Sequence, residues 1–167
     1  MKWLSIVDEY TRECLALEVD RSITSAGVLD VMMNLFCTRG VPGHIRSDNG
    51  PEFIAKALRE WLGRTPVETL YVEPGAPWEN GYAEAFHSRL RDEFLNVEMF
   101  GTMREAKVPG GMWRSDYNER RPHGSPGYRT LAEFARACVA CGSGSLRLQQ
   151  HTLLEERSMS TLITTGT

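Results

Sequence analysis

Short apolar runs at the start of the chain predict a β-hairpin. Residues 3–7 and 13–19 are apolar over most of their length, and the polar segment 8–12 separates them. Apolar runs of this length around a turn-forming segment are typical of paired antiparallel strands. We therefore expect two adjacent strands at the start of the fold.

Helical and strand patterns alternate after the hairpin. Apolar residues recur at helical spacing from Val28 to Phe36, where Ser22 or Thr24 can cap the helix and Gly40 can end it. A strand is expected next at 44–47, then a helix from Pro51 and a strand at 67–72. The helix from Pro51 is expected to bury Phe53, Ala57, Leu58, Trp61 and Leu62. With the helical run that follows, the predicted order is β-β-α-β-α-β-α.

A helical run from Glu79 to Asn96 carries two stripes of different character. The apolar stripe consists of Ala83, Phe86, Leu90 and Phe94, and a separate stripe holds Glu84, Ser88 and Arg91. We expect the apolar stripe to pack and the stripe with Glu84 to be exposed. His87 is expected on the helix surface.

The last third of the sequence predicts an interrupted helix and a tail. A helix starts well at Met103, but Pro109-Gly110-Gly111 is expected to break or delay it before it resumes at 113–119. A short helix is expected from Thr130 to about Ala137. We divide the chain into a core domain at 1–137 and a flexible tail at 138–167, because the tail is rich in Gly, Ser and Thr.

Two acidic residues are placed where chemistry can occur. Asp48 follows a predicted strand directly, and open α/β sheets place their sites at the carboxyl ends of strands. Glu84 lies on the exposed stripe of the later helix, beside Arg91. Two carboxylates near an arginine suggest a hard divalent cation next to a phosphate. The residues alone leave open that both acids are surface charges.

Several blocks resemble the DDE transposases of the IS3 insertion-sequence family, relatives of the retroviral integrases. Asp48-Asn49-Gly50-Pro51-Glu52-Phe53, followed by Glu84 after thirty-five intervening residues, is similar to the second and third acids of the DDE motif. The blocks occur in the family's order over about residues 3–136, which makes chance similarity a poor explanation. The other matching blocks are Val7 to Cys14, Arg89 to Asn96, Trp113 to His123 and Gly127 to Phe134.

The resemblance implies a fold and an activity. The fold would be α/β and ribonuclease-H-like, with three layers and a mixed sheet flanked by helices. The activity would be metal-dependent cleavage and transfer of DNA strands, with Asp48 and Glu84 as catalytic ligands of Mg²⁺ or Mn²⁺. Partners would be DNA, as transposon ends and target, and further transposase copies. Candidate DNA-binding residues are Asn49, His87, Arg91, Arg120, Arg121 and His123.

The first acid of the DDE motif has no match in this sequence. In the family it lies on a central strand upstream of the block that contains Asp8, so we expect the sheet to lack this strand. Asp8 is a weak substitute, because an aspartate in a turn more often hydrogen-bonds its own backbone. We therefore expect the catalytic activity to be impaired in this chain. The competing hypothesis is a non-catalytic remnant that binds DNA weakly or associates with full-length transposase.

Composition limits the remaining function classes. The formal net charge of −3 means that DNA contact has to come from a local basic cluster. No apolar run is long enough to span a bilayer and no signal peptide is evident, so we expect a cytoplasmic protein. Cys138 and Cys141 form a single pair with metal-like spacing, which is better explained as reduced thiols than as a zinc site.

Overall fold

The N-terminal hairpin forms the centre of the structure, as predicted. The computed structural model describes residues 1–47, 56–71, 81–124, 127–140 and 148–149. Strands β1 (Lys2–Asp8) and β2 (Cys14–Asp20) pair antiparallel, with Trp3 opposite Val19 and Ser5 opposite Leu17. Six of the seven residues of β1 are buried. This strand is therefore covered on both faces.

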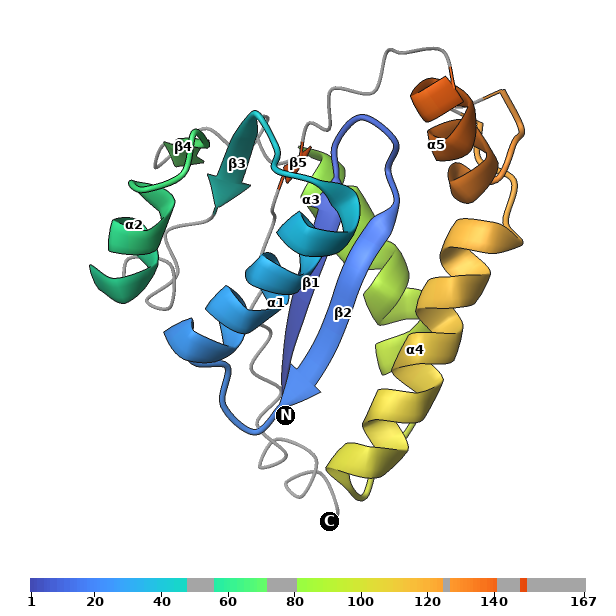
Figure 1. The fold of residues 1–167 in the computed structure, drawn as a ribbon. Helices are drawn as coiled ribbons and strands as arrows, with labels where there is room; N and C mark the ends of the chain where they lie inside the picture. Colours follow the sequence, from blue (N-terminus) through green and yellow to red (C-terminus); the bar gives the residue numbers. More distant parts are fainter. Residues whose placement is uncertain (48–55, 72–80, 125–126, 141–147, 150–167) are drawn as a thin grey trace.

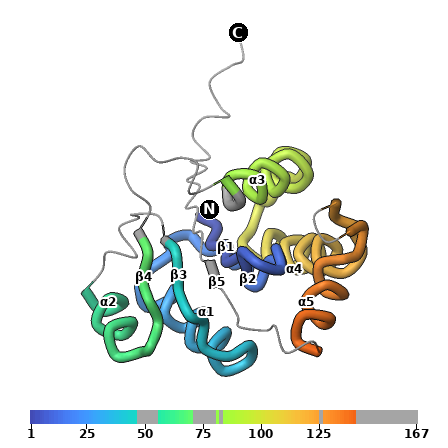
Figure 2. Tube along the Cα trace, turned by 90° about the horizontal axis from the view of Figure 1, so that it is seen from above, coloured from blue at the N-terminus to red at the C-terminus, as the bar shows by residue number. Residues whose placement is uncertain are grey.

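Two further strand pairings complete the sheet region. β3 (His44–Ser47) and β4 (Glu68–Tyr71) pair in parallel, as the α/β prediction requires. A strand that the sequence did not predict, β5 (Leu148–Gln149), pairs antiparallel with the end of β1 and also lies against β3. Figures 1 and 2 both show β5 between β1 and β3. The two halves of the sheet thus meet at β5.

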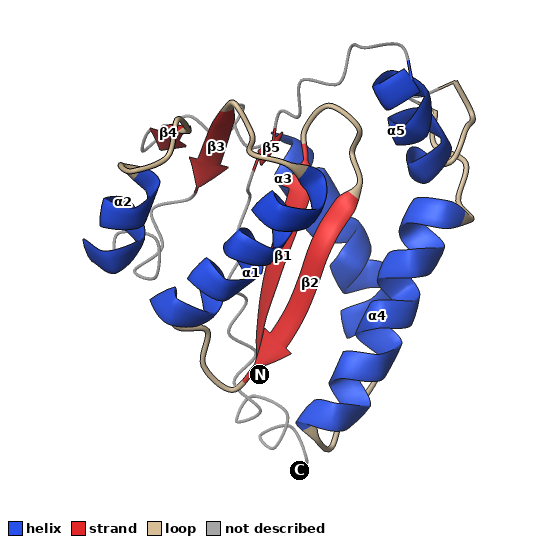
Figure 3. Ribbon diagram, viewed as in Figure 1, coloured by secondary structure: helices blue, strands red, loops and turns tan. Residues whose placement is uncertain are grey.

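Helices cover the two faces of the sheet with two separate apolar cores (Figure 2). On one face lie α1 (Ser25–Arg39) and α2 (Lys56–Leu62), packed through residues such as Met32 and Leu58. Thr24 caps α1 by accepting a hydrogen bond from the Gly27 amide, and Gly40 ends it at a φ of 93°. On the other face lie α3 (Gly81–Leu90), η2 (Arg91–Leu95) and α4 (Met103–Glu119). Helices, a mixed sheet and helices again make the three expected layers (Figure 3).

The predicted break in the fourth helix is wrong. α4 runs without interruption through Pro109. A capping box formed by Thr102 and Glu105 starts the helix, and Trp113 and Tyr117 bury its inner face. Gly110 lies against Trp3, where it allows the helix and β1 to approach closely. Tertiary packing of this face outweighs the poor helix propensity of the Pro-Gly-Gly segment.

Helix α2 does not bury every residue that the sequence predicts. Ala57 is exposed rather than buried, whereas Leu58 and Leu62 are buried as expected; Phe53 lies outside the described residues. Helix α5 (Leu131–Ala140) continues past residue 137, so the proposed domain boundary falls inside a helix. Across the described ranges, no helix has the length and apolar character needed to cross a membrane.

Candidate functional site

The strand β3 leads directly to the first candidate acid. β3 ends at Ser47, and Asp48 is the next residue in the chain. Asp48 and Asn49 themselves lie outside the described residues, so their contacts are not described. Because β3 and β4 are parallel, both strands end at the same edge of the sheet. This edge is where the sequence predicts the chemistry.

Glu84 lies in the first turn of α3, and its side chain is exposed. A carboxylate at this position is stabilised by the positive end of the helix dipole. The two other members of its predicted stripe, Ser88 and Arg91, are exposed as well. The expectation that this stripe is exposed is therefore confirmed.

The opposite stripe fixes α3 in the core. Phe86 is 3% exposed and Leu90 and Phe94 are buried, as predicted. The Phe86 ring makes edge contacts with Trp113 and Tyr117 of α4, with ring centroids 5.8 Å and 5.3 Å apart. These contacts set the rotation of α3 about its own axis. They thereby keep Glu84 on the exposed side.

His87 does not lie on the helix surface, contrary to expectation. It is 5% exposed, and its Nε2 atom lies 2.8 Å from the Ser5 hydroxyl on β1, which is also buried. This burial leaves the His87 imidazole inaccessible to DNA. The helical spacing contained the signal, because His87 lies four residues after Ala83 and three before Leu90. The apolar stripe therefore includes position 87.

The predicted basic cluster at the end of α4 separates into three different environments. Arg120 is exposed. Arg121 donates a hydrogen bond to Asp116 Oδ2 at 2.8 Å, forms a second ion pair with Glu93, and lies 5.7 Å from the centre of the Trp113 ring. Burial acts to lower the pKa of Arg121, but the two carboxylate partners outweigh it and raise that pKa. Arg121 is thus engaged within the protein.

His123 is buried and serves a structural contact. Its Nε2 atom donates to the Tyr117 carbonyl oxygen at 3.2 Å, and its Nδ1 atom accepts from Arg89 at 3.3 Å. Burial lowers the pKa of His123, and the neighbouring arginines act in the same direction. A neutral imidazole matches both hydrogen bonds. We conclude that His123 joins α4 to α3 rather than presenting positive charge to a ligand.

Asp8 is the last residue of β1 and takes part in the hairpin turn. Its Oδ1 atom accepts a hydrogen bond from the Tyr10 amide at 2.9 Å, as expected for a turn residue. The adjacent Glu9 forms ion pairs with two residues of β3, His44 at 4.0 Å and Arg46 at 3.7 Å. Asp48 lies outside the described residues, so the structure describes no contact between it and Asp8.

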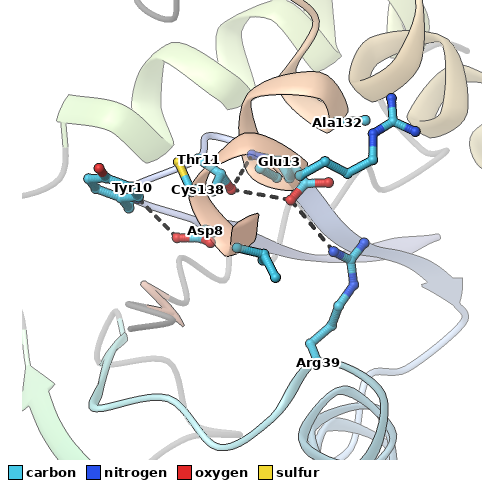
Figure 4. Close-up of a pocket in the computed structure, with 10 residues that line it drawn as sticks. Asp8, Tyr10, Thr11, Glu13, Arg39, Ala132 and Cys138 are labelled. Carbon is cyan, nitrogen blue, oxygen red and sulfur yellow. Dashed lines mark hydrogen bonds and ion pairs between the residues drawn. The ribbon is translucent and has the colours of Figure 1, made fainter. Parts of the chain in front are cut away.

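A pocket of about 370 Å³ lies beside this hairpin turn (Figure 4). Its polar wall holds Asp8, Thr11 and Glu13, and Arg39 reaches Glu13 at 3.6 Å. Burial raises the pKa of Asp8 and of Glu13, although hydrogen bonds and Arg39 act against it. Hydrogen bonds and the ion pair within the wall already engage these carboxylates. Within the described ranges, no group of three or more His, Cys, Asp or Glu side chains could hold a metal.

The cysteines do not form a bonded pair where they are described. Cys14 is buried, Cys37 is exposed and Cys138 is partly buried, all as free thiols. Cys141 lies outside the described residues. The expectation of reduced thiols for the pair Cys138 and Cys141 therefore stays a prediction.

Two protein-family profiles and several insertion-element proteins match the chain. Both profiles are described as Integrase core domain, and they match residues 1–77 and 65–130. An uncharacterized 39.2 kDa protein of insertion element IS476 from Xanthomonas euvesicatoria is 40% identical over 81% of this chain. An uncharacterized 31.7 kDa protein of insertion element IS407 from Burkholderia multivorans is 37% identical over 81% of it. The chain spans 39% and 49% of these two relatives.

Solved structures show the same fold at low sequence identity. The catalytic core domain of HTLV-2 integrase in complex with magnesium has a TM-score of 0.57 at 17% identity, covering 77% of this chain and 80% of that one. The catalytic core domain of BIV integrase has a TM-score of 0.57 at 21% identity, covering 77% and 81%. A chain of the simian T-cell lymphotropic virus intasome scores 0.60 at 16% identity, covering 77% and 45%. The ribonuclease-H-like fold class is confirmed.

Proposed function

Because the chain belongs to the integrase core family of insertion-element transposases, we propose that it is the catalytic core of an IS3-type enzyme that cleaves and joins DNA strands. The observation that carries the proposal is Glu84, exposed in the first turn of a helix whose other face is fixed in the core. An acid held this way faces solvent without requiring any rearrangement of α3. Its place in the chain matches the last acid of the DDE motif.

The proposed metal ligands are Asp48 and Glu84. Carboxylate oxygens suit Mg²⁺, or Mn²⁺, and Glu84 offers an exposed carboxylate of this kind. Magnesium is present in the similar HTLV-2 core, which supports this choice. When bound, such ions activate a water or a 3′-hydroxyl and stabilise the departing oxygen of a phosphodiester. The contribution of this chain is to hold the two carboxylates, one after a strand and one on a helix.

We propose that Arg91 and Arg120 contact the phosphate backbone of DNA. Both side chains are exposed, and Arg91 lies on the same stripe of the helical run as Glu84. Asn49 stays a candidate from the sequence alone. Arg121 would have to leave Glu93 and Asp116 before it could bind phosphate. We therefore expect Arg121 to contribute less to DNA binding than Arg91 and Arg120 do. The two histidines are not retained as DNA ligands.

A non-catalytic role is the second candidate, and the contacts of Asp8 favour it. Asp8, the one substitute considered for the first DDE acid, is engaged in the hairpin turn, where it accepts a hydrogen bond from the Tyr10 amide. In this role the chain would bind DNA weakly or associate with a full-length transposase in the cytoplasm. One of the similar solved structures is a viral intasome, which supports assembly with further copies.

Strand joining by the purified chain tests the proposal. A labelled DNA end and a target duplex are incubated with Mg²⁺ or Mn²⁺, and the parent is compared with Asp48→Asn and Glu84→Gln. Glu98→Gln is the matched control, because Glu98 is an exposed glutamate beyond η2. We expect product from the parent and the control, and a loss of at least about a hundredfold in both acid variants.

The outcome also separates the two candidates. A parent that is folded by circular dichroism and forms no product, with either metal, contradicts catalysis and supports the non-catalytic role. Product that survives in Glu84→Gln would remove Glu84 from the site. If the parent forms no product, its binding of labelled DNA is measured next. Binding without product would support weak DNA binding as the remaining function.

A further inference from the structure

The pocket beside the hairpin turn has no part in the proposed function. Its lining residues come from that turn, from the end of α1 and from α5, and Glu84 is not among them (Figure 4). Its volume of about 370 Å³ is within the range of about 300–1,000 Å³ that small-molecule sites occupy. The pocket is therefore large enough for a small organic molecule. Its charged lining residues are Asp8, Glu13, Arg39 and Arg136.

The charges of the pocket wall are sorted by burial. Asp8 and Glu13 are only 1% and 5% exposed. The side chain of Arg39 is 45% exposed, and Arg136 is exposed as well. The formal charges of the four side chains sum to zero, with the negative pair inside and the positive pair toward solvent. A ligand that complements this wall carries a cation at its inner end and an anion at its outer end.

The Glu13 carboxylate keeps one oxygen for a ligand. Thr11 donates a hydrogen bond to Oε2 of Glu13 at 3.3 Å, and Arg39 Nη1 lies 3.6 Å from the same oxygen (Figure 4). Among the described residues, Oε1 of Glu13 has no hydrogen-bond partner. Burial raises the pKa of Glu13, although Arg39 and Thr11 act against it. The buried carboxylate is thus incompletely compensated, and a charged N–H donor would stabilise it most.

The α5 side of the pocket is apolar. Ala132, Ala135 and Val139 line it at positions i, i+3 and i+7, which lie on one face of a helix. The two small alanines leave room in front of this face. Tyr10 of the hairpin also lines the pocket, and its ring lies 5.9 Å from the ring of Phe134 on α5. This contact holds the hairpin turn against α5, so the apolar face has a fixed position opposite the acids.

We propose that this pocket binds a free α-amino acid with a large apolar side chain. The ammonium group would donate to Oε1 of Glu13, and the carboxylate would pair with Arg39 and Arg136 on the exposed side. The apolar side chain would lie against the α5 face. A simple amine would match the acids but meet the two arginines, and a simple carboxylic acid would do the reverse. The site takes neither DNA nor metal, so it is a binding function beyond strand joining.

Four compounds test the proposal on the full chain, by isothermal titration calorimetry and saturation-transfer difference NMR at neutral pH. L-Phenylalanine carries both charges and an apolar ring. 2-Phenylethylamine lacks the carboxylate, 3-phenylpropionate lacks the ammonium group, and glycine lacks the ring. We expect L-phenylalanine to bind at least about tenfold more tightly than each of the other three, because each of them loses one complementary contact.

Charge variants with matched controls locate the binding. Glu13→Gln keeps the shape of the side chain and should weaken L-phenylalanine binding at least about tenfold, because the ammonium group loses its charged acceptor. Glu18→Gln is the control, since Glu18 is an exposed glutamate of the adjoining strand β2. Arg39→Gln combined with Arg136→Gln should weaken binding by a similar factor through loss of the carboxylate partners.

The arginine pair and the apolar face have controls of their own. Arg64→Gln combined with Arg104→Gln removes two exposed arginines that do not line the pocket and should leave binding unchanged. Ala132→Leu places a larger side chain in the pocket and should weaken binding at least about tenfold. Ala57→Leu makes the same change at an exposed position of α2 and should have no effect.

Several results would overturn the proposal. L-Phenylalanine that fails to bind, or that binds no better than the amine, the acid and glycine, would show that the wall does not select a zwitterion. Binding that persists in the arginine double variant and in Ala132→Leu would place the ligand elsewhere, and these two variants decide even if Glu13→Gln does not fold. The assay contains neither metal nor DNA. Its failure therefore leaves the strand-joining proposal untouched, and a failure of strand joining leaves this site standing.

Discussion

Gly110 tests how closely α4 packs on the central hairpin. A methyl group built on Gly110 would lie 2.9 Å from Cζ3 and 3.1 Å from Cη2 of Trp3. The indole has little room to withdraw, because Trp3 is 6% exposed and meets the Phe94 ring edge-on at a centroid distance of 5.5 Å. The substitution Gly110→Ala therefore forces either the indole or the helix to move.

Two effects of opposite sign decide the size of the change. Replacing glycine by alanine inside a helix stabilises by about 1 kcal/mol through backbone entropy. Overpacking a well-filled core costs about 1–3 kcal/mol. Gly111 is the matched control, because a methyl group there meets nothing within 4 Å. We expect Gly111→Ala to raise the free energy of unfolding by about 0.5–1 kcal/mol, and Gly110→Ala to fall about 1–3 kcal/mol below that control.

Urea unfolding followed by far-ultraviolet circular dichroism measures both variants. A second-site change sharpens the test: Trp3→Phe removes the ring atoms nearest to the new methyl group. In that background the penalty of Gly110→Ala should shrink by about 1 kcal/mol, since the two sites are in contact. If Gly110→Ala and Gly111→Ala stabilise equally, the close approach of α4 to β1 is refuted. An unchanged penalty in the Trp3→Phe background would assign the effect to another neighbour.

Three further substitutions or treatments have defined outcomes. Ser5→Ala should lower the free energy of unfolding by about 1–2 kcal/mol in urea, because it leaves the buried His87 Nε2 without its hydroxyl partner. Burial raises the pKa of Asp8 above its ordinary value of 3.8, so its contribution to stability is present below that value and is lost as pH rises through the folded-state pKa. Asp8→Asn keeps an oxygen acceptor in the turn, and thermal melts should therefore show it gaining on the parent as pH rises. Burial raises the pKa of Cys14 to about 12, so the Cys14 thiol should resist DTNB in the folded chain while the exposed Cys37 reacts.

Controls for these three tests are available in the same chain. Ser115→Ala changes an exposed serine and should stay within about 0.5 kcal/mol of the parent. Asp20→Asn is the matched control for Asp8→Asn, because Asp20 also accepts a backbone hydrogen bond, from Arg21, but is exposed. Cys14 should react once urea unfolds the chain. A pH trend shared by the two asparagine variants, or rapid labelling of Cys14 before unfolding, would contradict the burial described for these side chains.

Features set by local periodicity and capping could be predicted from the sequence. The hairpin, the limits of α1 at Thr24 and Gly40, and the exposed stripe with Glu84 all depend on residues close together in the chain. Gly110 was misjudged because its role depends on Trp3, far away in sequence. A rule based on propensity alone treats such a glycine as a helix breaker. The strand β5 was missed for a related reason, since its pairing with β1 joins the two ends of the described chain.

The candidate site shows the same division. Exposure of Glu84 followed from the helical period. The internal ion pairs of Arg121 did not, because Glu93 and Asp116 come from two different elements. His123 was likewise assigned to DNA contact from a run of basic residues. In the structure, hydrogen bonds with Tyr117 and Arg89 occupy both of its ring nitrogens. Charge runs in a sequence therefore overstate the basic surface when acids from other elements can reach them.

The position of Glu84 depends on the aromatic layer that also holds Gly110. Edge and tilted ring contacts link Trp3 to Phe94, Phe94 to Trp113, and Trp113 to Phe86, two residues after Glu84. Displacing the Trp3 ring disturbs this layer. The ring contacts then transmit the disturbance to the helix that carries Glu84. Gly110→Ala should therefore lose stability and strand joining together, whereas Glu84→Gln should lose strand joining with stability intact. The two variants separate the support of the site from its chemistry.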